Sequence, residues 1–386
     1  MCLLALLGSL HAQPSRPDVR AAFATAAAHY KRMLQTHTDT TVFPHSINAD
    51  GSRRDKDRGW WGSGFFGGSL WYLYEYTKDP FWREHAHRWT MAMEGEKTNT
   101  TTHDLGFMMY CPFGNGLRLT QNAQYTPILV QSARSLATRF DPQVQLIKSW
   151  DDFGKGFPYP VIIDNMMNLE LLYWAARAAD DPALARLATT HANHTLKHHF
   201  RSDHSSYHVV CYFENARPQT KRTAQGAFDE SAWARGQSWG LYGFTMVYRF
   251  TRDPKHRQQA ERIADYILTH PNLPADKVPY WDFYRPGEVR DASAAAIAAS
   301  ALLELSQYSA KKATYRRAAE QMLASLASPA YTAKAGENHH FILLHSTGDK
   351  PHNKEVDVPL SYADYYYLEA LLRYEQLQKT GKLTFR

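Results

Sequence analysis

The feature of this sequence that most limits its possible folds is a unit that occurs three times. Each unit is an aromatic-rich apolar stretch, an Asp-Pro pair and a polar amphipathic stretch. Asp at an N-cap accepts hydrogen bonds from free backbone N–H groups, and Pro at the first helical position loses nothing by lacking an N–H. Each pair therefore predicts the start of a second helix after a short turn. The pairs are Asp79-Pro80, Asp181-Pro182 and Asp253-Pro254.

Two more helical hairpins are predicted around residues 122–140 and 292–326, where apolar residues recur three and four apart. Few stretches alternate as strands do, so the sequence predicts an all-α fold. Repeated hairpins build an open solenoid or a closed toroid. Three segments rich in Gly and aromatic residues are expected to be loops and favour closure around a pocket. They are residues 59–68, 111–116 and 151–160.

The length of 386 residues fits two average domains or one large helical barrel, and no linker or low-complexity tract divides the chain. The apolar stretch in residues 1–12 is typical of a signal peptide, although no positively charged start precedes it. We therefore expect a periplasmic or secreted protein, with a cytoplasmic location as the alternative. No other stretch approaches the ~20 apolar residues that a membrane-spanning helix needs.

Several kinds of chemistry are not indicated. The formal charge of +6 favours anionic partners, but no cluster of Lys and Arg resembles a nucleic-acid-binding stripe. The three cysteines are too few and scattered for a disulfide framework or a zinc site. His191, His194 and His198 share one helix face, yet no Cys or acidic ligand accompanies them, so we expect an ordinary helix face and no metal. Serine hydrolase and nucleotide-binding motifs are missing from the sequence.

Two aspartates stand where a helix is expected to begin. Asp104 precedes the apolar run 105–110, and Asp164 follows Val161-Ile162-Ile163 and opens a strongly apolar helix. Desolvation raises the pKa of a carboxyl group, which suits a proton donor that works near neutral pH. Either residue could equally be an N-cap. Two such carboxylates at two helix starts indicate a facing pair across one pocket.

The densest polar and aromatic cluster lies in residues 223–244. A core helix does not need Arg-Gly-Gln beside Trp-Gly, whereas a pocket for a flat anionic sugar needs an Arg fork, amide groups and aromatic platforms. The high aromatic content of the chain fits either sugar binding or a large core. The cluster contains Gln225, Trp233, Arg235, Gln237, Trp239 and Tyr242.

Four motifs occur in order along the chain: HDLGF (103–107), PVIIDNMMNLELL (160–172), WARGQSWGLYGF (233–244) and DVPLSYADYYYLEALLR (357–373). Through them the chain resembles the unsaturated glucuronyl hydrolases, glycoside hydrolase family 88, from about Trp61 to Arg373. The resemblance implies an (α/α)6 barrel, a toroid of helical hairpins, formed by residues 13–386 as a single catalytic domain. It also implies an enzyme without metal or cofactor that removes a terminal 4,5-unsaturated uronic acid from oligosaccharides left by polysaccharide lyases.

The resemblance further implies a mechanism in which the vinyl ether of the sugar ring is hydrated, rather than the attack on the anomeric carbon that ordinary glycosidases use. Asp164 matches the acid that protonates C4 and then helps to deprotonate the water that adds at C5. Asp104 matches its partner carboxylate. The positions that match sugar-binding residues are Trp61 (rather than Trp60), His103, Trp150, His208, Gln225, Arg235, Gln237, Trp239 and Tyr362.

The loop Gly348 to Glu355 is expected to border the next sugar. It carries Lys350 and Lys354 without the Ser pair of members that prefer sulfated substrates. Three other functions stay open: an unsaturated rhamnogalacturonyl hydrolase with the same barrel and paired Asp, a sugar epimerase on a helical toroid, and a non-catalytic uronate-binding barrel in which both aspartates are caps.

Overall fold

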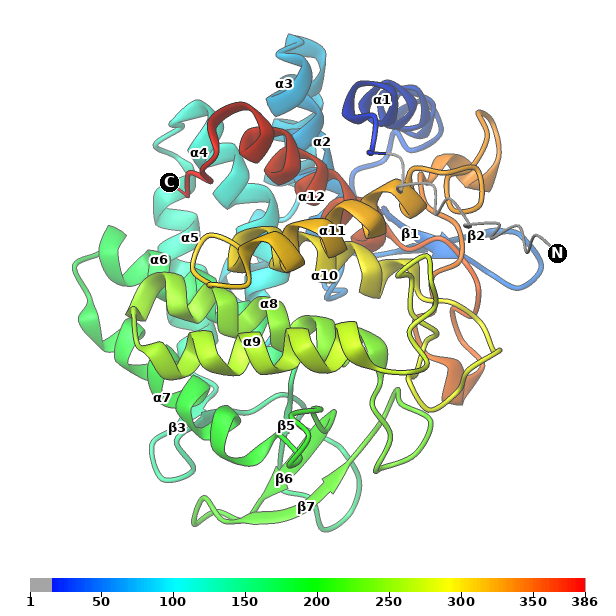
Figure 1. Cartoon of the computed structure of the whole chain (residues 1–386). Coiled ribbons are helices and arrows are strands. Elements are labelled where there is room, and N and C mark those ends of the chain that lie inside the picture. The colour runs from blue at the N-terminus through cyan, green and yellow to red at the C-terminus, as the bar shows by residue number, and fades with distance from the viewer. Residues whose placement is uncertain (1–15, 386) are drawn as a thin grey trace, which may run out of the picture.

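The computed structural model describes residues 16–385, so the predicted leader, residues 1–12, lies outside the described part. Helices dominate this part of the chain (Figure 1). Its buried apolar side chains form one main cluster that extends from Val19 to Leu377. None of the helices within the described range is long and apolar enough to cross a membrane.

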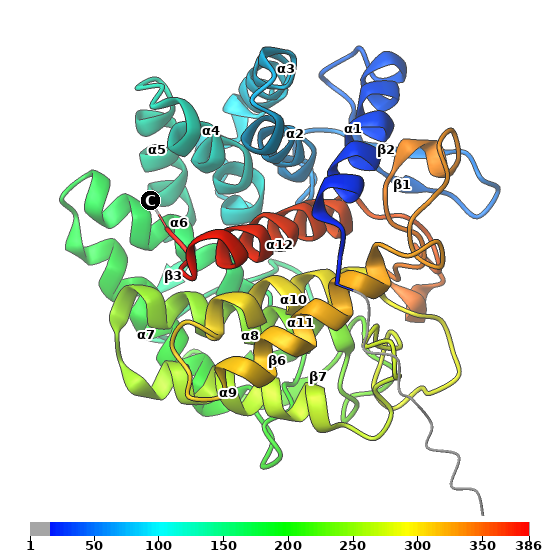
Figure 2. The ribbon, with the colours of Figure 1, turned by 45° about the horizontal axis from the view of Figure 1, so that its top comes forward.

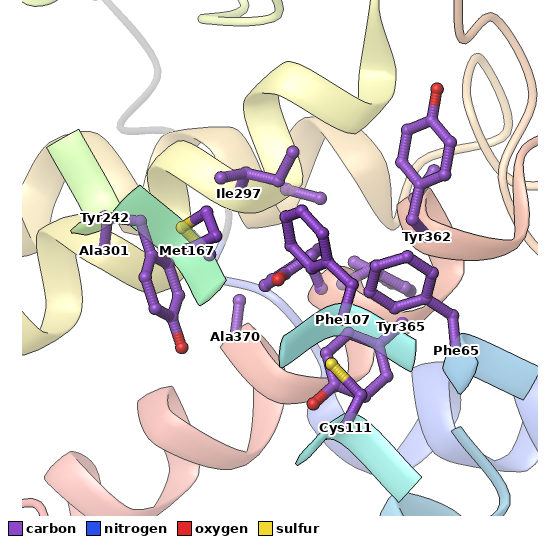
Figure 3. Close-up of a cluster of buried hydrophobic side chains, with 14 of the residues drawn as sticks. Phe65, Phe107, Cys111, Met167, Tyr242, Ile297, Ala301, Tyr362, Tyr365 and Ala370 are labelled. Carbon is purple, nitrogen blue, oxygen red and sulfur yellow. The ribbon is translucent and has the colours of Figure 1, made fainter. Parts of the chain in front are cut away.

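Six inner elements pack neighbour against neighbour in a closed ring within the described chain. In ring order they are α2 (Gly64–Thr77), the π-helical segment η2 (Gly106–Gly114), α6 (Asn165–Ala178), α8 (Ala234–Thr251), α10 (Ala292–Leu305) and α12 (Ser361–Thr380). Helix α12 closes the ring between α10 and α2 (Figure 2). Side chains from all six elements meet in the core shown in Figure 3, among them Phe65, Phe107, Met167, Tyr242, Ile297 and Tyr365.

A second set of helices covers this ring. Helix α3 packs on α2, α7 on α6, α9 on α8 and α11 on α10, whereas α5 contacts η2 and α6, and α1 contacts α2 and α12. The short helix α4 (Asn115–Thr120) continues η2. The bounds of the outer helices are Val19–Thr36 (α1), Pro80–Met91 (α3), Tyr125–Ala137 (α5), Pro182–His198 (α7), Pro254–Thr269 (α9) and Lys312–Leu326 (α11).

The helix starts predicted at the Asp-Pro pairs are confirmed. Each Asp is the N-cap of α3, α7 or α9, with Pro in the first turn. Each carboxylate accepts a hydrogen bond from the backbone N–H two residues later: Asp79 from Phe81 (2.9 Å), Asp181 from Ala183 (3.1 Å) and Asp253 from Lys255 (3.1 Å). The hairpin predicted in residues 292–326 is also present, as α10 and α11, whereas residues 122–140 contain the single helix α5 and the start of β3, so the hairpin predicted there is wrong.

The prediction of an all-α fold is inexact, because short strands form three small antiparallel sheets. Strands β1 (Phe43–Ile47) and β2 (Arg53–Lys56) pair, as do β3 (Phe140–Asp141) and β4 (Leu146–Ile147). The third sheet, at the bottom of Figure 1, contains β5 (Tyr159–Ile162), β6 (Val209–Tyr212) and β7 (Pro218–Arg222). Strands of two to five residues are too short to show a clear alternating pattern. Three 3₁₀ turns complete the description: η1 (Glu94–Thr98), η3 (Asn338–His340) and η4 (Lys350–His352).

The glycine-rich segment 111–116 is helical, not the loop that its composition predicts. Its glycines allow close packing rather than a turn. A Cβ added at Gly116 would lie 2.6 Å from the Tyr125 ring, and one at Gly114 would lie 2.9 Å from the Tyr110 ring. Part of residues 59–68 likewise forms the start of α2, whereas most of residues 151–160 is a loop, with Tyr159 and Pro160 in β5.

Candidate active site

Polar and aromatic side chains gather at the N-terminal ends of the six inner elements. Arg235 connects three of these ends, since its guanidinium lies 3.3 Å from Asp291 and 5.3 Å from the centre of the Tyr362 ring. Helix N-termini carry partial positive charge, so this end of the ring favours an anionic ligand. The side chains are Trp61 before α2, Asp104 before η2, Asp164 before α6, Arg235 in α8, Asp291 before α10 and Tyr362 in α12.

Asp164 occupies the N-cap position of α6, but its side chain makes no capping hydrogen bond. The carboxyl is 13% exposed, and its Oδ2 atom is buried without a hydrogen-bond partner in the described chain. Burial raises the pKa of Asp164 from its ordinary 3.8 to about 7; Arg235 opposes this shift and Asp104 adds to it. Near neutral pH a large fraction of Asp164 therefore carries the proton that a general acid needs.

His208 faces Asp164, with its Nε2 atom 3.8 Å from Oδ2 of the carboxyl. Its Nδ1 atom accepts hydrogen bonds from the backbone N–H groups of Ala224 and Gln225, both at 3.2 Å. Burial lowers the pKa of His208 to about 3, so the ring is neutral. Because Nδ1 accepts, the single ring proton lies on Nε2 and points toward Asp164.

Asp104 is held by side chains rather than by a helix end, and the N-cap of η2 is Leu105. Asn168 donates to Oδ1 of Asp104 at 3.4 Å and accepts from the backbone N–H of Phe107 at 3.0 Å, while Thr102 donates to Oδ2 at 3.3 Å. Asn168 follows Asp164 by four residues on α6, so both lie on one helix face. The two carboxyl groups therefore lie near each other, close enough for the Asp104 charge to act on Asp164.

His103 stands beside Asp104 much as His208 stands beside Asp164. Its Nε2 atom is 3.3 Å from Oδ1 of Asp104, and its Nδ1 atom is 2.8 Å from the carbonyl oxygen of Ser149. Burial lowers the pKa of His103, while the Asp104 charge acts in the opposite direction. Each carboxyl of the pair thus has its own buried histidine.

Aromatic rings form one wall of the site. The ring of Trp61 lies 5.0 Å from that of Tyr362 and 5.6 Å from that of Phe107, whereas Trp60 contacts His45 and Lys56. The structure thus places Trp61, rather than Trp60, in this wall. Trp239 packs on Phe107 with ring centres 5.1 Å apart and is 0% exposed, so it is no open stacking platform. Trp61 and Trp150 keep partly exposed rings.

Arg235 is not the open fork that its sequence context predicts. It donates to the carbonyl oxygens of Thr347 and Gly348, the latter at 2.6 Å. Gln225 donates to the same Gly348 oxygen at 3.0 Å. Both side chains therefore hold the loop that follows Ser346, and Arg235 adds positive charge near Asp164.

Gln237 has a similar supporting place. Its amide oxygen accepts from the backbone N–H of Ser206 at 2.8 Å, and its amide nitrogen donates to the Ser206 carbonyl at 3.2 Å. Ser206 lies two residues before His208, so Gln237 positions that histidine rather than reaching the pocket itself. Gln237 thus supports the site indirectly, by holding the backbone of Ser206.

Two residues of the site, Asn168 and Asp291, are not among those predicted from the sequence. Asn168 could have been found from its spacing of four residues after Asp164. From the sequence alone, Asp291 is expected to be only the N-cap of an Ala-rich helix. Its Oδ1 atom does accept a hydrogen bond from the backbone N–H of Ser293 at 3.0 Å. Its other oxygen faces Arg235, which no sequence pattern reveals.

Part of the helix face of α7 that carries the three histidines is buried in the protein core. His191 is fully buried and accepts a hydrogen bond from the backbone N–H of Ile147 at 3.0 Å. Within residues 16–385 no group of three or more His, Cys, Asp or Glu side chains is arranged to hold a metal ion. Cys111 and Cys211 are free thiols, both buried.

No family model matches the chain. An unsaturated glucuronyl hydrolase of Formosa agariphila is 48% identical to it over 322 residues, which cover 82% of this chain and 80% of that protein. The chain belongs to the unsaturated glucuronyl hydrolase family. The relative of this name from Bacillus sp. strain GL1 is 35% identical over 358 residues, covering 86% and 91% of the two chains. An unsaturated chondroitin disaccharide hydrolase of Streptococcus pyogenes is 33% identical over 344 residues, covering 86% and 85%.

Solved structures of unsaturated glucuronyl hydrolases agree with this assignment. The crystal structure of one described as specific for heparin has a TM-score of 0.91 and 47% identity, covering 94% of this chain and 98% of that one. That of the Bacillus sp. GL1 enzyme has a TM-score of 0.87 and 30% identity, covering 93% and 97%. As an unsaturated glucuronyl hydrolase, the protein is a glycoside hydrolase that removes terminal unsaturated uronic acid. This decides against the rhamnogalacturonyl, epimerase and non-catalytic alternatives.

Proposed function

We propose that the enzyme hydrates the double bond of the unsaturated uronic acid with Asp164 as the general acid. The observation that carries this proposal is the buried Asp164 carboxyl with its pKa raised to about 7, beside the neutral His208. Asp164 donates its proton to C4, and positive charge develops at C5 and the ring oxygen. Water then adds at C5 and returns a proton to Asp164, so the carboxyl is regenerated.

The C5 hemiketal formed in this way then opens. Its C5–O bond to the ring oxygen breaks to leave a ketone at C5, and the ring oxygen becomes a hydroxyl on C1. Collapse of that C1 hemiacetal breaks the bond to the leaving saccharide and gives an aldehyde. One water is consumed for each uronic acid released.

The surrounding residues fit supporting parts in this chemistry. Asp104, fixed by Asn168 and Thr102, is placed to accept hydrogen bonds from ring hydroxyls of the sugar. Its charge also contributes to the raised pKa of Asp164. The Nε2 proton of His208 is available to hold the Asp164 carboxylate after proton transfer, and the partly exposed Trp61 and Trp150 rings offer apolar faces to the substrate.

We propose further that the fold is an (α/α)6 barrel formed by residues 13–386 as a single catalytic domain. The closed ring of α2, η2, α6, α8, α10 and α12, each with an outer helix against it, supports this architecture. The leader-like residues 1–12 support export to the periplasm or the medium.

The substrates that we propose are disaccharides and longer oligosaccharides produced by glycosaminoglycan lyases, with those from heparin first. The support is the similarity to the enzyme described as specific for heparin and to the chondroitin disaccharide hydrolase. The positive formal charge of the chain and the helix N-termini around the site fit such anionic sugars.

The test is to mix the purified enzyme with unsaturated heparin, chondroitin and hyaluronan disaccharides and to follow the loss of enoate ultraviolet absorbance. We expect wild type to remove the absorbance, and Asp164→Asn to lower kcat by about 10²–10⁴, the usual contribution of general acid–base catalysis. Asp180→Asn, which changes an exposed carboxylate beyond the far end of α6, is the matched control. Full activity of Asp164→Asn would overturn the mechanism, and no turnover of any disaccharide would overturn the substrate class.

A further inference from the structure

A large cavity lies inside the ring of helices, toward the end opposite the catalytic carboxyls. Its volume of about 920 Å³ is within the usual range for small-molecule sites. The cavity extends from the C-terminal parts of α2, α8 and α12 inward to Gly106 and Phe107, whereas the active site lies at the N-terminal ends of the same elements. Cys111, Tyr242 and Tyr365, which are labelled in Figure 3, belong to its lining. We call this space the far cavity.

Three arginines border the far cavity, and glutamates pair with all of them. Arg249 lies in the last turn of α8, where the helix dipole places partial negative charge. Cations near helix C-termini are stabilising, so these pairs hold this end of the ring together by themselves. The pairs are Arg118 with Glu75 at 2.5 Å, Arg249 with Glu170 at 2.7 Å and Glu304 at 2.9 Å, and Arg373 with Glu304 at 3.2 Å and Glu369 at 3.4 Å.

The charges around the far cavity are balanced. Lys78 and Lys379 also line it, and Glu375 lies 2.9 Å from Lys379. Among the described lining residues and their direct partners, positive and negative side chains are then equal in number. A charged ligand would have to be buried without a counter-ion, which costs free energy, whereas an uncharged polar ligand keeps the balance. The positive side chains are Arg118, Arg249, Arg373, Lys78 and Lys379, and the negative ones are Glu75, Glu170, Glu304, Glu369 and Glu375.

Tyrosine side chains make up much of the remaining lining. Tyr110 and Tyr366 bring two phenol groups to it, whereas the hydroxyls of Tyr72 and Tyr242 already donate to Glu369 at 2.7 and 3.0 Å. Phenol rings pack on the apolar faces of sugar rings, and phenol hydroxyls exchange hydrogen bonds with sugar hydroxyls. A tyrosine-rich lining with balanced charge therefore fits an uncharged sugar.

The segment after α12 lies at the mouth of the far cavity. Gly381 ends α12 with φ +73°, a backbone conformation that favours glycine, and the chain then continues so that Leu383 and Phe385 line the cavity. The Phe385 ring centre lies 4.2 Å from the Arg249 guanidinium, whose Nη2 atom is buried without a hydrogen-bond partner in the described chain. Residues 381–385 are all exposed or partly exposed, so little packing holds them in place. Movement of Phe385 would therefore expose an unpaired donor to a ligand oxygen.

We propose that the far cavity is a second binding site, which takes an uncharged sugar, and that residues 381–385 are its movable cover. This inference goes beyond the proposed function and does not depend on it, since neither Asp104 nor Asp164 lines the far cavity. The sugar accepts a hydrogen bond from Nη2 of Arg249 and packs on the tyrosine rings. Phe107 lines the far cavity and lies 5.6 Å from Trp61 in the wall of the active site, so the sugar contacts the back of that wall.

The binding test compares sugars of similar size and different charge by isothermal titration calorimetry with the wild-type enzyme. Glucose and N-acetylglucosamine are uncharged, glucuronate is the anionic counterpart and glucosamine the cationic one. We expect each uncharged sugar to bind about tenfold more tightly than either charged one. Leu372→Trp fills the cavity from a partly exposed position and should abolish binding. Arg249→Lys keeps the charge but removes the Nη2 donor, so it should weaken binding about tenfold.

Leu187→Trp is the matched control, because Leu187 is a partly exposed leucine on α7 outside the lining of the far cavity. This variant should bind the sugars as wild type does. Absence of binding for both uncharged sugars would overturn the second site. Binding that Leu372→Trp leaves unchanged would overturn it as well, since the sugar would then lie elsewhere, and tighter binding of glucuronate than of glucose would overturn the assignment of an uncharged ligand.

The cover is tested through Cys111, which lines the far cavity and becomes the one cysteine of the chain in a Cys2→Ser, Cys211→Ser background. Phe385→Ala should raise the rate at which a maleimide labels Cys111 by about tenfold, because local opening becomes easier, and N-acetylglucosamine should lower that rate. Phe228→Ala removes an exposed ring elsewhere and should leave the rate unchanged. Equal rates with Phe385 and with Phe385→Ala would overturn the cover.

Discussion

The raised pKa of Asp164 has a cost in folding stability that Asp164→Asn should remove. An unfolded Asp releases its proton near 3.8, whereas folded Asp164 keeps it until about pH 7. Between these values the folded state binds more protons than the unfolded state, so wild-type stability falls as pH rises. Below pH 3.8 both states are protonated and this effect is lost; above pH 7 both are ionised and the cost is constant.

The size of this cost follows from the shift. A difference of about three pKa units corresponds to about 4 kcal/mol at pH 8, since each unit is about 1.36 kcal/mol. The side chain of Asp164 is 13% exposed, so solvent screens little of this cost. Asn is neutral at every pH and is nearly the same shape. The stability of Asp164→Asn relative to wild type should therefore rise by about 2 kcal/mol between pH 5 and pH 7, and level off above about pH 8.

The assay is urea unfolding followed by tryptophan fluorescence at pH 5, 6, 7 and 8. The change of the difference with pH is the measured quantity, because any constant effect of the amide cancels. Asp180→Asn, which makes the same change on the surface beyond α6, is the control measured in parallel. A flat difference for Asp164→Asn would refute the reasoning, since it would mean that Asp164 ionises normally in the folded enzyme.

Two further changes test packing and buried polar groups. In Gly106→Ala the new Cβ would lie 2.5 Å from Cα of Asn168, so η2 must shift and kcat/KM should fall by about 100-fold. The control is Gly240→Ala, which should keep full activity because its new Cβ would meet no neighbour closer than 3.5 Å. Asp364→Ala removes the acceptor of two 2.9 Å hydrogen bonds from the backbone N–H groups of Ile342 and Leu343, so urea unfolding should show a loss of about 3 kcal/mol in folding stability. Tyr30→Phe should cost less, because it removes only the donor of a 3.3 Å hydrogen bond to the same carboxyl. An unchanged Gly106→Ala enzyme or equal losses for the last two variants would contradict these assignments.

The helical repeat could be predicted because its signals are local. An Asp-Pro pair acts within one helical turn, and all three pairs start helices. The β5–β6–β7 sheet could not be predicted, because β5 and β6 are only four residues long and pair although they lie far apart in the sequence. Composition predicts the wrong structure for residues 111–116, because glycine occurs both in turns and at close helix contacts, and only the neighbouring residues in space distinguish these uses.

Some residues of the candidate site could likewise be predicted from the sequence, and others could not. Burial of Asp164 could be predicted from the apolar residues on both sides of it. The parts taken by Arg235 and Gln237 could not, because their partners, the carbonyls of Thr347 and Gly348 and the backbone of Ser206, lie far away in sequence. A pattern shows that a polar side chain is unusual at a position, but not whether backbone groups or a ligand will satisfy it.

The position of α12 in the ring has a consequence for biosynthesis. This helix, near the C-terminus of the described chain, packs against α2, near its start, so a growing polypeptide leaves a ribosome with the ring still open. Until α12 emerges, the apolar face of α2 that it covers, including Phe65 and Tyr72, stays uncovered by its partner. Contacts between such distant segments form slowly and expose the nascent chain to aggregation. Synthesis of this enzyme should therefore depend on chaperones that shield the open ring until its last helix arrives.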